Sequence, residues 1–497
     1  MAPQVKSLSD KAGFLILANL IKYSVGFVMP VVLVRLLSQS DYGTYQQLIL
    51  ISSAAMGILT LGIPSSVYYF YHHVGGSTRG TLIVQSTLLV GAAGIIAGIA
   101  IHLGSGVLSS QLGNPALIPL LGLYAVSVTV TIASEHCMAF IVSQGGFRLA
   151  VLFETGEVFL RVLLLITPLA LGFGLHGIVV GLLLFAMVRF AVRNGFLFFA
   201  GNEDFSGATR SFFVRRQLGY SLPMAMVSLS SMVGSTFNKG IIAASFSPAQ
   251  YAVYAVGNFP IPLSSIFQAS VADVLRATLP PLVREGNHAE VARIVRESSR
   301  KLSTIVLPSF MFLFAFADQI ITLFFTALYQ DSISIFRIFV LSVPLDMLIL
   351  SAVPQVYGRT RLNLYINLST MVLLVVLSWT LLRWVGFYGA VIATVAVQYY
   401  SSSAFALVAL RLTGSTVGQL FPVGHLLRVL LAAALAALAG RATLGLVHPA
   451  LLEVMVAGTV YSLVFLALAL TIGILSRQDV QLMRGWIYRF LPQRKPS

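Results

Sequence analysis

The chain has 497 residues, of which 57% are hydrophobic and only 9% are charged, and its formal net charge is +15. Because a soluble domain carries about 25% charged residues, this composition excludes a water-soluble protein and leaves no room for a large soluble domain. A single cysteine, Cys137, excludes an internal disulfide or a cysteine-based metal site, and we expect it to pack in the core.

Glycine, proline and charged clusters divide the hydrophobic runs into predicted transmembrane helices of at least the ~20 residues that cross a bilayer. The first run follows the polar segment MAPQVKSLSDK and is too long for a signal peptide, so we interpret it as a retained span. In chain order, we predict fourteen spans at about 12–35, 42–71, 80–102, 115–143, 147–172, 176–200, 215–244, 249–282, 301–326, 332–357, 361–385, 387–410, 423–447 and 449–475. The links GFGLHG (172–177) and VGFYG (385–389) are so short that the helices flanking them must be antiparallel neighbours.

Basic residues indicate the orientation of these spans. With the N-terminus in the cytoplasm, most of the 31 lysines and arginines lie in or beside cytoplasmic loops. The opposite side collects only Arg35, Arg337, Arg383 and Arg441. Positive charge favours the cytoplasmic side, so both termini are predicted to be cytoplasmic in a multi-pass protein of the inner (cytoplasmic) membrane. This bias explains most of the net charge, and no nucleic-acid partner is needed to account for it.

Two segments are predicted to lie along the membrane as amphipathic helices. NHAEVARIVRESSRKL (287–302) begins with Asn287 as an N-cap and has Glu290 three residues later. Its apolar stripe consists of Val291, Ile294, Val295 and Leu302. The basic tail at 476–497 is the second segment. The alternative interpretation of both is a solvated basic face that only fixes topology.

A short motif occurs in both halves of the chain. LSQSDYGTY contains Tyr42, and ASFSPAQYAVY contains Tyr251, 209 residues later. The pair Gly174 and Gly177 also recurs, 212 residues later, in the second half. Six spans separate the copies, and this even number predicts two parallel six-helix lobes. The predicted domains are an N-lobe at 1–200, a cytoplasmic linker at 201–214, a C-lobe at 215–412, two further helices at 413–475 and the tail at 476–497.

Each copy of the motif is predicted to form the outer turn between the first two helices of its lobe. Gly43 permits tight backbone geometry there, and tyrosines suit the membrane interface. We therefore expect the motif to have a structural role and no contact with substrate.

Three basic residues inside spans are candidate substrate-binding residues, because a charge within the bilayer is costly and marks a functional site. Lys22 lies near the middle of the first span with no acidic residue at neighbouring helical positions. Such a cation either lines a cavity, snorkels or forms a structural pair. Arg276 has Asp273 three residues before it, so a local pair is its alternative role. Lys239 lies near the outer end of its span, and snorkelling is the alternative there.

The fifth and sixth spans carry a second charged group. Glu154, Glu157 and Arg161 share one face of the fifth span, and Arg189 and Arg193 share a face of the sixth. The hairpin makes these spans neighbours, with Glu154 and Arg193 at one depth and Glu157 and Arg189 at another. We predict an interhelical ion-pair network, with a proton- or sodium-coupled relay as the functional alternative.

Glu135 and Asp346 are weaker candidates for ion coupling. The sequence has no phosphate-binding P-loop, so direct use of ATP is not expected. It also has no H-E-x-x-H motif or cysteine–histidine cluster, so we expect no metal and no other cofactor.

The segment RLLSQSDYGTYQQ followed by LGIPSSVYYFYHH resembles the amino-terminal lobe of the multidrug/oligosaccharidyl-lipid/polysaccharide (MOP) exporter superfamily. FNKGIIAASFSPAQYAVYAVGNF resembles the start of its second lobe, and fourteen spans fit its polysaccharide-flippase (Wzx-type) branch. The resemblance extends to about residue 475. It implies an all-α, MATE-like membrane fold and a flippase, without catalysis, that carries a polyprenyl-pyrophosphate-linked oligosaccharide to the outer leaflet. It also implies alternating access around a basic cavity, which Lys22 and Arg276 fit.

Other functions remain open. A drug or metabolite exporter of the same superfamily would need a modest apolar cavity and a buried acidic site. An oligosaccharide polymerase or ligase would need catalytic groups on a substantial outer loop, whereas the longest predicted one, 103–114, has no charged residue. A structural or scaffold protein would not need charges inside its spans. The expected partners are the lipid-linked oligosaccharide, membrane lipid and polysaccharide polymerase or assembly proteins, and the chain is expected to be a monomer.

Overall fold

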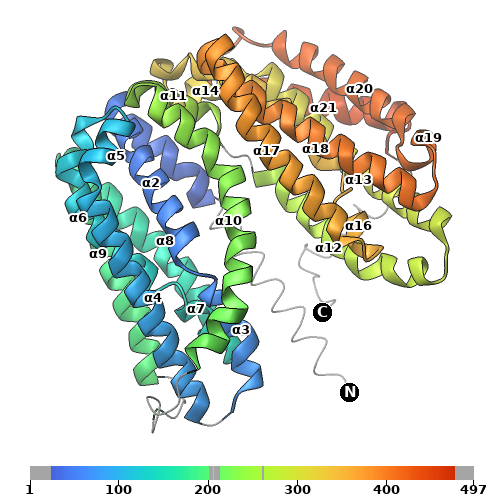
Figure 1. The fold of residues 1–497 in the computed structure, drawn as a ribbon. Coiled ribbons are helices and arrows are strands. Elements are labelled where there is room, and N and C mark those ends of the chain that lie inside the picture. The colour runs from blue at the N-terminus through green and yellow to red at the C-terminus, as the bar shows by residue number, and fades with distance from the viewer. Residues whose placement is uncertain (1–23, 76, 201–204, 206–212, 260–261, 476–497) are drawn as a thin grey trace, which may run out of the picture. The chain divides into compact units, whose positions relative to one another are not determined.

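The structure is a computed structural model that describes residues 24–75, 77–200, 205, 213–259 and 262–475. Every regular element in this part of the chain is a helix, so the predicted all-α class is confirmed. The chain divides into two compact units, Met1–Ala255 (unit 1) and Val256–Ser497 (unit 2), each of which is described by itself (Figure 1). The tail at 476–497, most of the linker at 201–214 and Lys22 lie outside the described residues.

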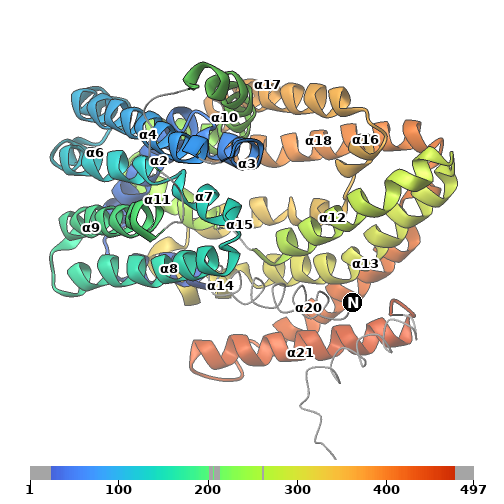
Figure 2. The ribbon, with the colours of Figure 1, turned by 90° about the horizontal axis from the view of Figure 1, so that it is seen from below.

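The elements of unit 1 are a helix at Ser24–Leu36, α2 (Gln39–Leu59), α3 (Ile63–His73), α4 (Ser77–Leu103), α5 (Ser105–Gln111), η1 (Pro115–Leu117), α6 (Ile118–Ala133), α7 (Cys137–Ser143), α8 (Phe147–Ala170), α9 (Gly174–Gly195), the π-helical η2 (Phe196–Ala200), α10 (Val214–Ser245) and most of α11 (Pro248–Gly257). α4 packs against α6, and α9 packs against both α6 and α8 (Figure 2).

The elements of unit 2 are α12 (Pro262–Arg284), α13 (His288–Ala315), α14 (Ala317–Phe325), η3 (Ala327–Tyr329), α15 (Ser332–Val340), η4 (Val343–Met347), α16 (Ala352–Val356), α17 (Thr360–Val385), η5 (Gly386–Tyr388), α18 (Gly389–Thr413), α19 (Val417–Leu420), α20 (Val423–Arg441) and α21 (Ala450–Thr471). The main helix pairs are α17 with α18, α20 with α21, and α13 with α20.

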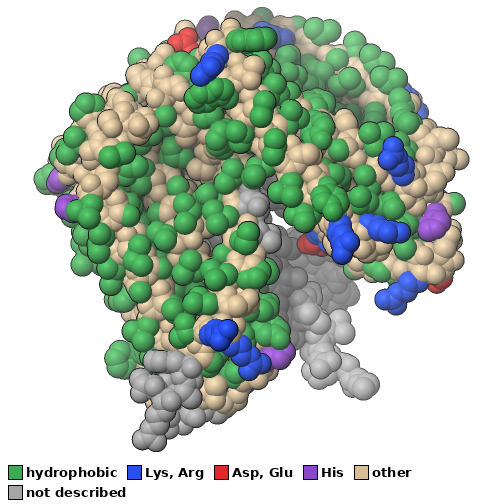
Figure 3. Space-filling view, in the orientation of Figure 1, with side chains coloured by type: hydrophobic (Ala, Val, Ile, Leu, Met, Phe, Trp, Pro, Cys, Tyr) green, Lys and Arg blue, Asp and Glu red, His purple; other side chains and the backbone are tan. Residues whose placement is uncertain are grey.

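Eight stretches of the described chain are long and apolar enough to cross a membrane, or nine if the bent pair α13 and α14 is counted. One of the eight, Thr360–Thr413, contains both α17 and α18, which pack together as a hairpin. Hydrophobic side chains also cover much of the visible surface (Figure 3), as contact with lipid requires. The chain is thus a multi-pass membrane protein, and the total of fourteen spans remains a prediction.

Both predicted tight hairpins are present. Residues 171–173 alone connect α8 to α9, and η5 alone connects α17 to α18. Gly172 and Gly386 have φ angles of 82° and 71°, a backbone conformation that favours glycine. Equivalent hairpins therefore occur in the two halves of the chain, as the repeat predicts.

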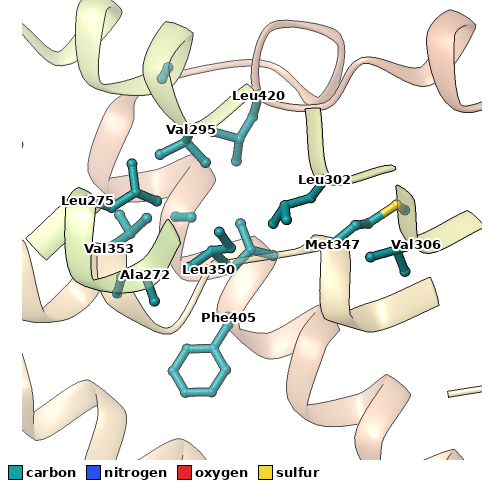
Figure 4. Close-up of a cluster of buried hydrophobic side chains, with 14 of the residues drawn as sticks. Ala272, Leu275, Val295, Leu302, Val306, Met347, Leu350, Val353, Phe405 and Leu420 are labelled. Atoms are coloured by element: carbon teal, nitrogen blue, oxygen red, sulfur yellow. The ribbon is translucent and has the colours of Figure 1, made fainter. Parts of the chain in front are cut away.

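The segment at 287–302 is the first half of α13 and does not form a separate helix. Its predicted N-cap is present, because the Asn287 side chain accepts a hydrogen bond of 3.2 Å from the Glu290 amide. Its apolar stripe, however, packs into the core of unit 2, where the Val295 and Leu302 side chains lie among those of α12 and η4 (Figure 4). The stripe assigned to the membrane surface therefore faces protein, because those elements supply an apolar partner.

The predicted span at 301–326 is broken. α13 ends at Ala315 and α14 continues at a bend of 72°. Arg441 Nη1 donates a hydrogen bond of 2.8 Å to the Ala315 carbonyl oxygen. This bond satisfies one of the carbonyl groups that a helix end leaves without an intrahelical partner.

The two copies of the repeated motif form the N-termini of α2 and α11. In the first copy the Asp41 amide donates to Ser38 Oγ at 3.1 Å, and in the second the Gln250 amide donates to Ser247 Oγ at 3.3 Å. Both are serine caps, which satisfy amides that the first turn of a helix leaves unpaired. The structural repeat thus has the spacing that the sequence repeat shows.

The tyrosines of the motif are buried, with Tyr42 and Tyr251 each 2% exposed. Each lies beside the tyrosine three residues later, with ring centroids 6.2 Å apart in both copies. Gly43 lies within α2 and not in a turn. A Cβ there would lie 1.7 Å from the Pro248 carbonyl oxygen, so the motif needs glycine for close approach of two backbones.

Unit 1 extends beyond the predicted N-lobe, because α10 packs against α2 and α3. The buried Gln217 on α10 donates hydrogen bonds of 3.0 and 2.9 Å to Ser66 Oγ and Ser86 Oγ. The predicted linker at 201–214 therefore falls inside unit 1. The compact units are a different division of the chain from the predicted lobes, which remain a prediction.

Candidate functional site

The fourth predicted span is interrupted between α6 and α7. The amides of Ser134 and Glu135 bond to carbonyl oxygens only three residues earlier, at 3.2 and 3.0 Å, so the chain tightens and leaves the α-helical path. Non-helical backbone at membrane depth persists only where it is buried in protein or lines a polar cavity. The break places Glu135 beside Arg189 of α9 and His136 beside Thr87 of α4.

Two glutamates and two arginines form a compact charged cluster around this break. Arg193 binds Glu157 through two parallel bonds, Nε to Oε1 at 2.6 Å and Nη2 to Oε2 at 2.7 Å. Arg189 Nη2 donates to Glu135 Oε1, and Arg189 Nε lies 3.8 Å from Glu157 Oε2. Only 6% of the Arg193 side chain is exposed. Charges buried this deeply need such pairing, because removing either partner leaves an uncompensated ion.

The pairing differs in detail from the one that the sequence predicts. Glu157, Arg189 and Arg193 do meet across the α8–α9 hairpin, but Arg193 takes Glu157 as its carboxylate partner in place of Glu154. Arg189 takes Glu135, which the sequence treats only as a separate candidate. The prediction compares depths along the fifth and sixth spans only. It therefore omits the fourth span, whose break between α6 and α7 brings Glu135 to Arg189. Whether the cluster couples ions or is purely structural remains a prediction.

His136 is a buried member of this region that sequence reasoning does not single out. Its Nε2 lies 2.8 Å from Thr87 Oγ1. The Thr87 hydroxyl donates its own proton to the Ile83 carbonyl at 2.9 Å, so Nε2 is the donor in the pair. Nδ1 is buried without a hydrogen-bond partner in the described part of the chain. The hydrogen bond between His136 and Thr87 holds the break against α4. No residue spacing in the sequence indicates the contact.

A cavity of about 230 Å³ lies beside the charged cluster, between α2, α6, α8 and α9. Its polar lining consists of Ser52, Ser53, Tyr124, Ser127, Thr131, Arg161 and Arg189. Among the residues that the structure describes, none that lines the cavity carries a carboxylate. Arg161 makes no hydrogen bond or ion pair with the residues that the structure describes. The cavity is therefore polar and has an excess of positive charge.

The three candidate substrate-binding cations lie in different parts of the chain, with Lys239 in unit 1 and Arg276 in unit 2. Lys22 lies outside the described residues. Arg276 is exposed on α12, where it pairs with Asp273 at 2.7 Å and donates to Gln355 Oε1 at 3.0 Å, so the alternative local pair is present. Lys239 is exposed on α10 and has no ion pair with any described residue. Their role in binding substrate remains a prediction.

Asp346, the other weaker coupling candidate, belongs to unit 2. It lies in the short helix η4 and is partly buried. It has an interaction within the protein, so it is not a free carboxylate. Glu135 and the cluster that it joins belong to unit 1, so the two weaker candidates lie in different units.

Unit 2 contains a larger groove of about 830 Å³ between α13 and α21. Hydrophobic residues dominate its lining, among them Pro308, Phe312, Leu313, Met455, Leu463 and Leu466. Both helices belong to stretches long and apolar enough to cross a membrane. The groove is therefore suited to a hydrocarbon chain.

Comparison with known families decides the family of this chain. A family model described as polysaccharide biosynthesis protein matches residues 32–334. The chain belongs to this polysaccharide biosynthesis family. No curated protein matches it.

Solved structures show which fold this member of the polysaccharide biosynthesis family has. Lipid II flippase MurJ, in an inward closed conformation, aligns with a TM-score of 0.68 at 12% identity, over 92% of this chain and 99% of that chain. An inward-facing multidrug resistance MATE family transporter of the MOP superfamily aligns with a TM-score of 0.61 at 16% identity, over 80% and 98% of the two chains. The MATE-like membrane fold predicted from the sequence is confirmed. At these identities the likeness establishes fold and not substrate.

Proposed function

We propose that this protein is a flippase that moves a polyprenyl-(pyro)phosphate-linked oligosaccharide from the inner to the outer leaflet of the cytoplasmic membrane. The match to the polysaccharide biosynthesis family over residues 32–334 carries the proposal, because it places the chain in glycan assembly. The all-helical, multi-pass fold supports it, because moving a lipid-linked glycan needs a protein path through the bilayer and no large soluble domain.

The groove between α13 and α21 supports a substrate with a hydrocarbon tail. Four of its lining residues carry hydroxyl groups: Ser309, Thr459, Tyr461 and Ser462. Each donates to a backbone carbonyl at 2.7–2.8 Å, so none needs a partner in the groove. The surface offered to a ligand is therefore mostly apolar, and a polyprenyl chain can pass from the bilayer into the groove without burying polar groups that lack hydrogen bonds.

The headgroup of such a substrate is anionic, because each phosphate that links lipid to glycan carries a negative charge. We assign its recognition to Lys22, with Arg276 and Lys239 as further candidates, because basic groups within spans lower the cost of moving a (pyro)phosphate out of the headgroup region. One or two such contacts suffice, since transport requires release as well as binding.

A cation-coupled exporter of drugs or metabolites is the second candidate. The partly buried carboxylates of Glu135 and Glu157 favour it, because transporters use carboxylates within spans to couple ions. Their pairing with arginines weighs against it, since a carboxylate held by Arg189 or Arg193 is less available to a proton or a sodium ion. A polymerase or ligase is less favoured, because the predicted outer loop at 103–114 contains mainly the short helix α5 and no charged residue.

A deletion strain tests the proposal and separates the alternatives. Loss of a flippase should leave lipid-linked oligosaccharide complete but accumulated at the inner leaflet, where an impermeant oxidant applied to intact spheroplasts does not reach it. Loss of a polymerase would instead leave single repeat units accessible from outside. Unchanged amounts and accessibility of the lipid-linked glycan would contradict the flippase and favour an exporter of another substrate.

A further inference from the structure

We propose that the cavity between α2, α6, α8 and α9 binds a small monovalent anion of about the size of chloride, with the Arg161 guanidinium as its charged partner. The proposal rests on the geometry of unit 1 and is independent of which lipid-linked substrate the protein moves.

The first observation is the charge balance around the cavity. In the Glu135–Arg189 and Glu157–Arg193 pairs, each carboxylate neutralises one guanidinium. The positive charge of Arg161 is not compensated by either pair. Arg161 has no hydrogen bond or ion pair with the described residues. Glu154, seven positions earlier on α8, lies about 10 Å away along the helix axis. The Arg161 side chain is exposed, and a charge within the bilayer requires a partner, so this site has the electrostatics of an anion site.

The position of Arg161 on α8 excludes the simpler explanation of snorkelling. Helix α8 has 24 residues, Phe147–Ala170, and Arg161 is near its middle. The nearer end is nine residues away, or ~13 Å at ~1.5 Å per residue. An arginine side chain extends only about half that distance, and α8 packs along α9, which is long and apolar enough to cross a membrane, so the guanidinium stays level with the middle of α9. Arg161 lines the polar cavity, which provides the environment that lipid does not.

The second observation is a set of hydrogen-bond donors without acceptors. Ser127 and Thr131 line the cavity one helical turn apart on α6, and neither hydroxyl has a hydrogen bond to a described residue. By contrast, the Thr129 hydroxyl on the same helix donates to the Ala125 carbonyl at 3.0 Å. Arg189 Nε is also buried without a hydrogen-bond partner among the described residues. These groups, together with the guanidinium of Arg161, are the donors that a small anion requires.

Size selects the class of anion. The volume of about 230 Å³ accommodates a halide with several water molecules, each of which occupies about 30 Å³ in the liquid. A diphosphate carrying a polyprenyl chain and a glycan is too large to enter it. The lining contributes no carboxylate, so a cation would meet only positive charge. Chloride is the abundant ion of the right size and charge, and bromide and nitrate are close substitutes.

The test measures anion binding on the purified full-length protein in detergent. Chloride replaces gluconate at constant sodium concentration, and the thermal unfolding midpoint is followed together with equilibrium binding of radioactive chloride. A ligand that binds only the folded state raises the midpoint in a saturable way. We expect one chloride per chain, displaced by bromide or nitrate and not by the larger gluconate. Equal midpoints in chloride and gluconate with no saturable binding would overturn the proposal without any variant.

Variants then locate the ion. Arg161→Gln should weaken chloride binding at least ~10-fold, since it removes a charge-assisted contact, whereas Arg161→Lys should retain part of the affinity. Ser127→Ala should weaken binding a few-fold. Arg148→Gln is the matched control, because Arg148 is an exposed arginine on the same helix that does not line the cavity. Wild-type chloride affinity in Arg161→Gln would overturn the assignment, and the assay needs no lipid substrate, so its result does not depend on the flippase proposal.

Discussion

Gly43 on α2 and Pro248 on α11 lie so close that a Cβ on Gly43 would come within 1.7 Å of the Pro248 carbonyl oxygen and 2.4 Å of its carbonyl carbon. Each residue belongs to one copy of the motif that the chain repeats after 209 residues. The two copies therefore pack against each other within unit 1, and each copy contains the serine that caps its helix. This contact gives the repeated motif a structural role that involves both of its copies.

The contact predicts that Gly43→Ala destabilises unit 1. The new methyl group meets backbone atoms, which cannot rotate away as a side chain can, so we expect a loss of about 3 kcal/mol. The measurement is the thermal unfolding midpoint in detergent together with the amount of folded protein in the membrane. Gly91→Ala is the control, because a Cβ at Gly91 on α4 meets no atom within 4 Å. Equal stability of the two variants would contradict the contact.

The Glu157–Arg193 pair predicts a second, larger effect. Glu157→Gln leaves the Arg193 guanidinium buried without a carboxylate, which costs about 3–5 kcal/mol. Adding Arg193→Gln should not add its full single-variant effect, because the same interaction is already lost. The measurement is a double-mutant cycle on thermal stability and on the yield of folded protein.

The pair Glu290 and Arg293 provides the control for this cycle. It has the same two-bond geometry, at 2.7 and 2.6 Å, but lies at the exposed start of α13, so its removal should change stability little. Additive effects at Glu157 and Arg193 would contradict a structural pair. Normal yield of Glu157→Gln with loss of dependence on an ion gradient would instead indicate the coupling role.

The sequence predicts the caps and hairpins of this protein better than it predicts which distant residues contact one another. Asn287 and the 172–177 and 385–389 hairpins follow local rules of capping and chain reversal, and the structure has all three. Contacts between residues far apart in the sequence follow no such local rule. Two examples are the close approach of Gly43 to Pro248 and the Glu135–Arg189 pair. Both depend on how separate helices pack together, and one sequence alone does not specify that packing.

The same limit explains the error at the start of α13. An apolar stripe on a basic helix fits a membrane surface or a protein core equally well. Val295 and Leu302 pack in a core to which the preceding helix α12 and the more distant η4 contribute, and this decides in favour of the core. The bend after Ala315 likewise depends on a distant residue, since Arg441 bonds to the carbonyl group at the helix end.

The predicted orientation can be tested with single cysteines. The native Cys137 is buried, so it contributes little background labelling. Ser110→Cys, at an exposed position on α5, should react with an impermeant maleimide on intact cells. Glu285→Cys, exposed at the end of α12, should react only after permeabilisation. The reverse pattern would invert the orientation that the basic residues predict.

Lys22 provides the test of headgroup recognition. Lys22→Ala should abolish most flipping while protein levels stay normal, because it removes the cation that the sequence predicts near the middle of the first span. Lys22→Arg should retain part of the activity, since charge matters more there than fork geometry. Lys6→Ala, in the polar segment before the first span, is the control and should behave as wild type. The measurement is outer-leaflet glycan per unit of inserted protein, and wild-type output from Lys22→Ala would remove Lys22 from the site.

The most direct test of the flippase proposal is the movement of lipid-linked oligosaccharide in vesicles that contain only the purified protein. The lipid carrier is distributed over both leaflets, ion gradients are imposed in turn, and an impermeant oxidant reports the fraction of glycan that reaches the outer leaflet. The account predicts that nearly all of the glycan becomes accessible with the wild-type protein, whereas protein-free vesicles expose only the fraction that starts outside. Accessibility equal to that of protein-free vesicles, with the protein shown to be folded and under every gradient, would contradict the account.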